Sequence, residues 1–552
     1  MSLPLFRKKS LSSALSETGD GTHGGAGLTR SLTVRDLTAF GIAAIIGAGS
    51  FSSMGQACFS GGPGVILLFI ICGIACGFTA LCYAEFASRV PASGSAYTYA
   101  YISFGELFAW IIGWALLMEY SIGNIYVAFS WSGYFTNLLD ATGLHIPEWM
   151  TCNYRSAHRA FLDSTAGEGL TAWLNAPVIG GLHIIFDLPA LLINVIITWL
   201  VYVGVSESRN VSNFMVLIKL LIIILVIVVG AMYIDIDNWT PFMPNQFKGV
   251  MGGVAAVFFA YIGFDAISTL AEESKNPQRD LPKGMIWSLV ICTVVYILLS
   301  LVLTGMVPSS MLNVSDPLAE VFKIKGVKWM LLVVSVAAVV AMTSVILVFQ
   351  MGQPRIWMTM SRDGLLPKRF SSIHPKYKTP GFATIITGLV VGIPILFTDE
   401  TFVLDFTSIG TLFAFVLVCG GVLSLPPKTA EESKGRFNLP YINGQYIIPL
   451  LSILIWIALA WFQPGYFGEL FNFDHGAFST NFPFIVFYLV WAIVAVFAVI
   501  RKYSLIPVLG LLSCCYLLTG MAPSNWIWFT VWLLIGLVVY FLYGYRKSKL
   551  RV

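Results

Sequence analysis

The sequence predicts an all-α polytopic membrane protein, and two observations carry that prediction. Of the 552 residues, 57% are hydrophobic and only 11% are charged, with a mean hydropathy of +0.81. A soluble domain carries about 25% charged residues, and a soluble chain of this length has no core large enough for so much apolar surface. The apolar residues also form long continuous runs, which favour membrane helices over the alternating strands of a barrel. A cytosolic enzyme, a nucleic-acid-binding protein and a disordered scaffold are excluded.

The apolar runs give the number of expected helices. Most approach the roughly 20 residues that a helix needs to cross a bilayer. They lie near 36–59, 64–88, 105–138, 187–206, 210–234, 249–272, 284–306, 329–353, 382–398, 401–424, 446–463, 483–500, 505–522 and 525–545. We therefore expect about 14 transmembrane helices.

The basic residues predict the orientation. With both termini inside, 25 of the 32 Lys and Arg residues fall on the cytoplasmic side, six fall outside, and Lys219 lies within a span. Lys and Arg collect on the cytoplasmic side of membrane proteins. We expect a multi-pass protein of the plasma membrane, or of the inner membrane in a bacterium, with both termini cytoplasmic. One outside loop, 139–186, is long and contains a stretch suited to a short surface helix.

Two spans, the first and the sixth, contain glycine near the middle of the bilayer. Span 1 reads Ile45-Ile46-Gly47-Ala48-Gly49-Ser50, and span 6 carries Gly263 after Phe258 and Phe259. Two interrupted spans entering from opposite sides indicate an inverted repeat of five helices. A helix broken at this depth must line a cavity, because lipid cannot satisfy the freed backbone groups.

The expected breaks define the kind of ligand. Amides freed after Gly47 suit a carboxylate, and the carbonyls freed before each break suit an ammonium. One small zwitterion satisfies both sets, so we expect an α-amino acid. Phe259 lies where a gate would be. The candidate substrate-binding residues are Ile45, Ile46, Gly47, Ala48, Gly49, Ser50, Phe258, Phe259, Ala260 and Ile262. The alternative is that these glycines only allow close helix packing.

Ionisable residues within the spans are the second indication of a functional site. Lys219 lies about 15 Å deep in span 5, where an ionised Lys costs about 2.5–3.5 kcal/mol, so it is a candidate for proton coupling. Glu119 in span 3, with Met342 and Thr343 in span 8, are candidates for the side-chain pocket. Asp265 follows the span 6 break and is expected to cap the second half of that helix. We expect no catalytic residue, no metal site and no cofactor.

Several segments together resemble the amino acid–polyamine–organocation superfamily, in its cationic amino acid transporter branch and bacterial relatives. They lie at 46–49, 82–88, 91–99, 105–114, 118–120, 258–273, 352–355, 360–367 and 544–546. The resemblance implies a five-plus-five inverted-repeat transporter fold with substrate at the breaks of spans 1 and 6. It also implies a proton-linked group in which Lys219 occupies the place of a sodium ion. Ser50 departs from the Ile usual in the family, and the hairpin 446–500 is an apparent insertion.

The resulting hypothesis is a proton-coupled L-amino acid permease that works by alternating access, and not an enzyme. Its expected partners are the amino acid, protons and membrane lipids, with no nucleic acid; protein partners, and the choice between cationic and small neutral substrates, stay open. The alternatives are an amino acid exchanger and a non-transporting sensor. The expected divisions are a tail at 1–34, five-helix repeats at 35–234 and 235–424, four further helices at 425–545, and a tail at 546–552.

Overall fold

The computed structural model describes most of the chain. The described residues are 6–9, 32–47, 49–90, 95–163, 168–204, 209–314, 316–425, 436–462, 465, 468, 470–471 and 475–550. Within them the protein is almost wholly helical, and its one sheet is a two-stranded antiparallel hairpin of β1 (Val178–Ile179) and β2 (Leu182–His183).

The helices of the first half cover the predicted apolar runs. They are α2 (Val34–Ile45), the π-helical turn η2 (Gly49–Ser53), α3 (Met54–Gly61), η3 (Gly62–Gly64), α4 (Val65–Arg89), α5 (Ser95–Ser103), α6 (Glu106–Ala141), η4 (Glu148–Met150), α7 (Tyr154–Leu162), α8 (Glu168–Asn175), α9 (Leu188–Val203) and α10 (Arg209–Ala231). Of these, α5, η4, α7 and α8 are additions that lie between the predicted runs.

The second half contains the remaining helices. They are η5 (Ile236–Trp239), α11 (Gln246–Gly252), α12 (Val254–Phe259), η6 (Phe264–Glu273), α13 (Pro277–Met306), η7 (Ser309–Met311), α14 (Pro317–Ile324), α15 (Lys328–Arg362), η8 (Lys368–Ser371), α16 (Gly381–Ile395), α17 (Glu400–Ser424), α19 (Ile447–Phe462), α21 (His475–Arg501), α22 (Leu505–Thr519), α23 (Pro523–Val539), η9 (Tyr540–Gly544) and α24 (Tyr545–Lys547).

The length and composition of these helices fit a membrane protein. In the part of the chain that is described, eight helical segments are long and apolar enough to cross a bilayer, and five further apolar helices have 10–17 residues. Each of the 14 predicted runs carries helix. Many large apolar side chains on the outer helix faces are exposed, among them Trp199 and Leu389, as expected for surfaces that face lipid.

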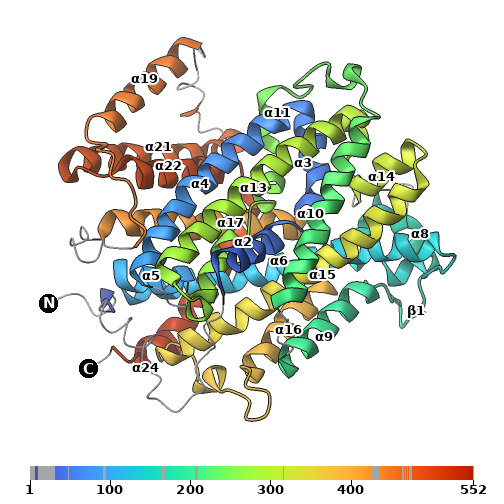
Figure 1. Cartoon of the computed structure of the whole chain (residues 1–552), viewed down its shortest axis with the longest axis horizontal. Coiled ribbons are helices and arrows are strands. Elements are labelled where there is room, and N and C mark those ends of the chain that lie inside the picture. Colours follow the sequence, from blue (N-terminus) through green and yellow to red (C-terminus); the bar gives the residue numbers. More distant parts are fainter. Residues whose placement is uncertain are drawn as a thin grey trace.

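The core is built from a few long helices. The most extensive contacts join α6 to α15 and α13 to α4, and α2 packs against α13. Figure 1 shows α2 near the middle of the molecule, with α19 and α21 at one edge and α9 and α16 at another. The C-terminal ends of α2 and α12 lie inside the protein, since Ile45 and Phe259 are buried.

The beginning and end of the chain meet at one side of the core. The Lys9 ammonium lies 2.9 Å from a carboxylate oxygen of Asp363 after α15, and the Tyr97 hydroxyl donates to the other oxygen at 2.7 Å. The buried Glu106 accepts hydrogen bonds from the hydroxyls of Tyr540 and Ser548. These contacts join α5, α6 and α15 to both ends of the chain and close this side.

The long loop 139–186 folds on its own. In place of the single surface helix expected from the sequence, it forms α7, α8 and the β1–β2 hairpin around a small core that includes Ala157 and Trp173. The guanidinium groups of Arg155 and Arg159 lie 3.1 and 3.3 Å from Asp399 Oδ2, at the start of α17. The loop is therefore held against the membrane helices on the side opposite Lys9.

Candidate functional site

The first predicted break is present. Helix α2 ends at Ile45, Ile46 has extended backbone angles (φ −81°, ψ 101°), and the chain resumes in the π-helical turn η2 at Gly49. Ala48 lies outside the described residues. A Cβ at Gly47 would lie 2.3 Å from a methyl carbon of Val345, so only glycine fits at that position without movement of the Val345 side chain.

The second break is also present. Helix α12 ends at Phe259, and the chain turns through Gly263, whose φ of +118° strongly favours glycine. The 3₁₀-helix η6 follows from Phe264. The expectation that Asp265 caps this second half is wrong. The N-cap position is Gly263 and Asp265 is the second residue of η6, because the left-handed turn starts the helix two residues earlier.

The two breaks lie back to back. A Cβ at Gly49 would lie 2.6 Å from Ala260 Cα, and a Cβ at Gly263 would lie 3.0 Å from the carbonyl carbon of Ala44. Backbone therefore touches backbone at both crossings. The carbonyl ends of α2 and α12 and the amide end of η2 are brought to one place in the core.

The carbonyls before the first break already have partners. Ile45 O accepts a hydrogen bond from the Tyr296 hydroxyl at 2.9 Å, and Ile46 O accepts one from the Lys219 ammonium at 3.3 Å. Each carbonyl oxygen has two lone pairs, so each can accept one more donor. An incoming ammonium would share Ile46 O with Lys219.

The carbonyls before the second break make turn hydrogen bonds. Phe258 O accepts from the Tyr261 amide at 2.9 Å, and Phe259 O accepts from the Ile262 amide at 3.1 Å. These bonds tighten the last turn of α12. They leave the second lone pair of each oxygen for another donor.

On the amide side, local bonds consume some of the expected donors. The amides of Ser50 and Phe51 both donate to Gly47 O at 3.0 Å, and so does the Ser50 hydroxyl at 3.0 Å. Ser50 is fully buried. The Ser50 hydroxyl, at the position where the resembling family usually has Ile, therefore hydrogen-bonds the Gly47 carbonyl exposed by the break.

Lys219 joins three helices at the first break. Its side chain on α10 is buried, with 1% of the residue exposed, and its ammonium donates to Ala43 O and Ile46 O at 3.3 Å. It also donates to the Ser344 hydroxyl on α15. Two carbonyls and a hydroxyl are the oxygen ligands that a small cation would use. The ammonium thus holds the end of α2 against α10 and α15.

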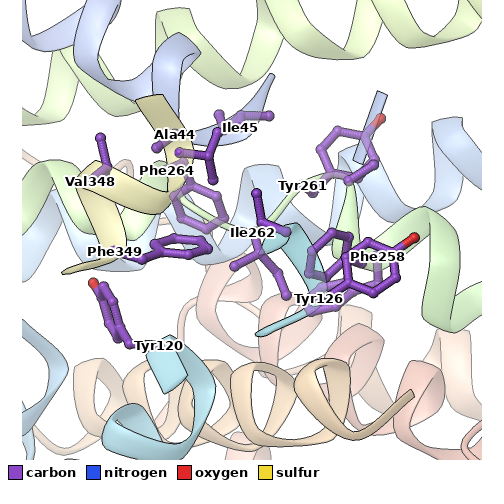
Figure 2. Packing of buried hydrophobic residues seen from close by; sticks show 14 of the residues in the cluster. Ala44, Ile45, Tyr120, Tyr126, Phe258, Tyr261, Ile262, Phe264, Val348 and Phe349 are labelled. Carbon is purple, nitrogen blue, oxygen red and sulfur yellow. The ribbon is translucent and has the colours of Figure 1, made fainter. Parts of the chain in front are cut away.

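A small apolar cavity lies at the crossing. It has a volume of about 10 Å³, about enough for one water molecule. Figure 2 shows Ala44, Ile45, Ile262 and Phe349 turned toward one another in this region. The lining residues are Ala44, Ile45, Gly49, Val127, Phe259, Ile262, Val345 and Phe349. The site is closed as it stands, and its wall carries no ionisable side chain.

The three residues predicted for the side-chain pocket do not line this small closed cavity, and their role stays a prediction. They are Glu119, Met342 and Thr343. Glu119 lies on α6 about two turns from Val127 and is buried, with 4% of the residue exposed. The Thr343 hydroxyl accepts a hydrogen bond from the indole of Trp131 at 2.9 Å.

Sequence reasoning predicted Ile45, Phe259 and Ile262 of the wall but missed Ala44 and the wall residues of α6 and α15. Val127 on α6 and Val345 and Phe349 on α15 line the cavity, but each sits in a long apolar helix where nothing distinguishes it from its neighbours. The one usable signal was the spacing of Val345 and Phe349. Residues four apart lie on one helix face, and span 8 was already expected to form a wall.

Two family models match this chain. The family model described as "Amino acid permease" matches residues 32–494, and the model described as "C-terminus of AA_permease" matches residues 503–548. The chain therefore belongs to the amino acid permease family. Members are membrane transporters rather than enzymes, so the chain is a multi-pass amino acid transporter.

Three relatives place the chain more closely. The branched-chain amino acid permease BcaP of Bacillus subtilis is 37% identical over 549 residues, covering 99% of each chain. The methylthioribose transporter of the same organism is 41% identical over 462 residues, covering 84% of this chain and 93% of the relative. The chloroplastic cationic amino acid transporter 9 of Arabidopsis thaliana is 35% identical over 560 residues, covering 98% and 92%.

Proposed function

We propose that this protein is a secondary active transporter that carries apolar L-amino acids into the cell together with protons. It does so by alternating access in a five-plus-five inverted-repeat fold with about 14 transmembrane helices. Both termini are cytoplasmic, and the membrane is the plasma membrane, or the inner membrane in a bacterium. The observation that carries the proposal is the pair of touching breaks with the Lys219 ammonium on the carbonyls of α2.

The backbone of the breaks suits the common part of every amino acid. Amides from Gly47 to Gly49 would meet the carboxylate, while the free lone pairs of Ile46 O and Phe259 O would meet the ammonium. Since these contacts are to backbone, they select the zwitterion and not the side chain. Selection among amino acids then depends on the wall.

The wall supports an apolar side chain. Val127, Phe259, Val345 and Phe349 offer no partner to a guanidinium or a second ammonium, and leaving such a charge unpaired costs several kcal/mol. Branched aliphatic side chains lose no hydrogen bonds there. The similarity to a branched-chain permease supports this choice, whereas the similarity to cationic amino acid transporters favours a cationic substrate.

The closed state of the cavity supports alternating access. The cavity is too small for an amino acid, and contacts close the protein on both sides, through Lys9–Asp363 on one and Arg155–Asp399 on the other. A transporter passes through such a state between its two open states. Loading therefore requires outward movement of α6 or α15 from the breaks.

The experiment is uptake into proteoliposomes at equal pH on both sides. Labelled L-valine, L-arginine and methylthioribose are offered separately, and liposomes without protein are the control. We expect saturable uptake of L-valine, with L-arginine at least about tenfold less effective by uptake rate over KM. Preference for L-arginine would move the side-chain pocket to Glu119, and uptake of methylthioribose alone would contradict the proposed binding of a zwitterion.

A further inference from the structure

A chain of hydrogen bonds leads from the start of α17 to the cavity wall. Glu400 is the first residue of α17, and its Oε1 accepts hydrogen bonds from the hydroxyls of Ser52 and Ser130, both at 3.3 Å. Ser52 lies in η2, just after the first break, and Ser130 lies in α6. One carboxyl oxygen thus connects three elements that must move apart when this side of the protein opens.

The next link is an aromatic pair at the cavity. The Tyr126 hydroxyl donates to Ser52 Oγ at 3.2 Å, and the Tyr126 ring meets the Phe259 ring edge-to-face with centroids 4.6 Å apart. Phe259 lines the cavity. The position of Tyr126 therefore fixes where the Phe259 ring lies over the space that a substrate would enter.

The direction of these bonds depends on Glu400. A serine hydroxyl has one proton to donate. Because Ser52 gives that proton to Glu400, its oxygen is left to accept from Tyr126. Ser52 and Tyr126 are buried, at 3% and 2% exposure, so water does not readily replace either bond. Without an acceptor at residue 400, Ser52 can instead donate to the Tyr126 oxygen, so the direction of this bond is no longer fixed and the Tyr126 hydroxyl can turn to another acceptor.

The start of α17 is itself held in place. Asp399 caps the helix by accepting from the Phe402 amide at 2.9 Å, and its other oxygen faces Arg155 and Arg159 of the outer loop. Glu400 is therefore carried on a fixed helix end, on the side of the protein next to the loop 139–186. The Glu400 carboxyl contacts Ser52 and Ser130 in the core, whereas the Asp399 carboxylate pairs with the arginines of the outer loop.

We propose that Glu400 is a positioning residue of the gate next to the 139–186 loop, and that it holds Phe259 over the substrate through Ser52 and Tyr126. Closing this gate requires an oxygen acceptor at residue 400 that reaches both serines. The proposal rests on the transport function above, and it names a residue that does not touch the substrate.

The first test separates binding from turnover. Uptake of L-valine is measured for Glu400→Ala, Glu400→Gln and Glu400→Asp, with Glu320→Gln as the matched control, since Glu320 pairs with Lys323 on the surface of α14. We expect Glu400→Ala and Glu400→Asp to raise KM at least about fivefold, because the substrate escapes from an unheld gate. Glu400→Gln keeps the acceptor and its reach, so its KM stays within about twofold of the wild type.

The second test asks whether Glu400 acts through Tyr126. Tyr126→Phe removes the hydroxyl that joins the ring to Ser52. If the chain of contacts is the mechanism, the double variant with Glu400→Ala raises KM no further than either single variant. If the two substitutions instead multiply each other's effect on KM, the two residues act independently and the proposal is overturned.

The third test does not depend on transport. Val127→Cys places a thiol in the cavity wall, and its reaction with a small water-soluble methanethiosulfonate is followed by mass spectrometry of the peptide that carries it. We expect Glu400→Ala to speed labelling at least about fivefold and Glu400→Gln to leave it unchanged. Equal labelling of Val127→Cys with Glu, Ala or Gln at residue 400 overturns the gate. If the wild type transports none of the amino acids but the Val127→Cys variants label as expected, only the proposed function is refuted.

Discussion

At the residue scale, the proposed mechanism depends most on Lys219. A buried ammonium surrounded by two carbonyl oxygens and a hydroxyl does the structural work of a bound cation, yet it can also lose its proton. Without the charge, the hydrogen bonds that hold the end of α2 to α10 and α15 weaken, because a neutral amine has one donor fewer and carries no positive charge. Gain and loss of one proton would thereby bias the packing of the first break.

We therefore expect Lys219→Met to separate coupling from movement. L-valine accumulation driven by an inward proton gradient should fall at least about tenfold, because the side chain of Met has no proton to exchange. Exchange of internal for external L-valine should stay within about threefold of the wild type, since both sides then load the same site. Lys248→Met on the exposed helix α11 is the matched control. Undiminished gradient-driven accumulation in Lys219→Met would remove this residue from the mechanism.

Some of the site could be predicted residue by residue and some could not. Gly47, Gly49 and Lys219 stand out because glycine and lysine are costly in the middle of a membrane helix, so each needs a reason. Val345 and Glu400 give no such signal. Valine is common in an apolar span, so Val345 does not stand out. A glutamate at a helix start is explained by its favourable interaction with the helix dipole, and only the folded structure shows that Glu400 contacts Ser52 and Ser130.

At the scale of elements, the crossing of α2–η2 with α12–η6 is the centre of the molecule. The backbones approach so closely at Gly49 and Ala260 that no side chain fits between them. Close approach lets the carbonyl ends of two half-helices and the amide end of a third face one ligand. In the proposed mechanism this contact, rather than any single side chain, forms the binding site for a zwitterion.

We expect Gly49→Ala to damage this contact. The added Cβ would lie 2.6 Å from Ala260 Cα, which belongs to backbone and yields little, so overpacking should cost about 1–3 kcal/mol. Uptake of L-valine should fall and the thermal midpoint should drop by several degrees. The matched control is Gly252→Ala in α11, where a Cβ meets nothing within 4 Å. This control should change the uptake of L-valine and the thermal midpoint only slightly. Equal effects of the two substitutions would mean that the crossing tolerates a side chain.

The helices themselves were the most predictable elements. Continuous apolar runs predict helices whatever their partners, and each run carries helix in the structure. Partners are harder to predict, because apolar faces in a membrane protein are alike whether they meet lipid or protein. Glu119 is an example, since its depth made it a candidate for the substrate pocket, yet it is not among the residues that line the present cavity.

At the scale of the whole molecule, contacts close the protein on both sides of the crossing. On one side the chain ends tie α5, α6 and α15 together through Asp363 and Glu106. On the other, the 139–186 loop is tied to α17 through Asp399, and Glu400 reaches η2 and α6. A transporter that opens each side in turn must release one set of contacts while it keeps the other.

The most direct test is to measure proton and amino acid fluxes together. Purified protein is placed in liposomes that contain a pH-sensitive dye, the outside is made acidic, and labelled L-valine is added. The proposed mechanism predicts that L-valine accumulates above its external concentration while the interior acidifies faster than without it, and that Lys219→Met does neither. L-valine entry that ignores the gradient and requires internal amino acid would contradict proton coupling and make the protein an exchanger.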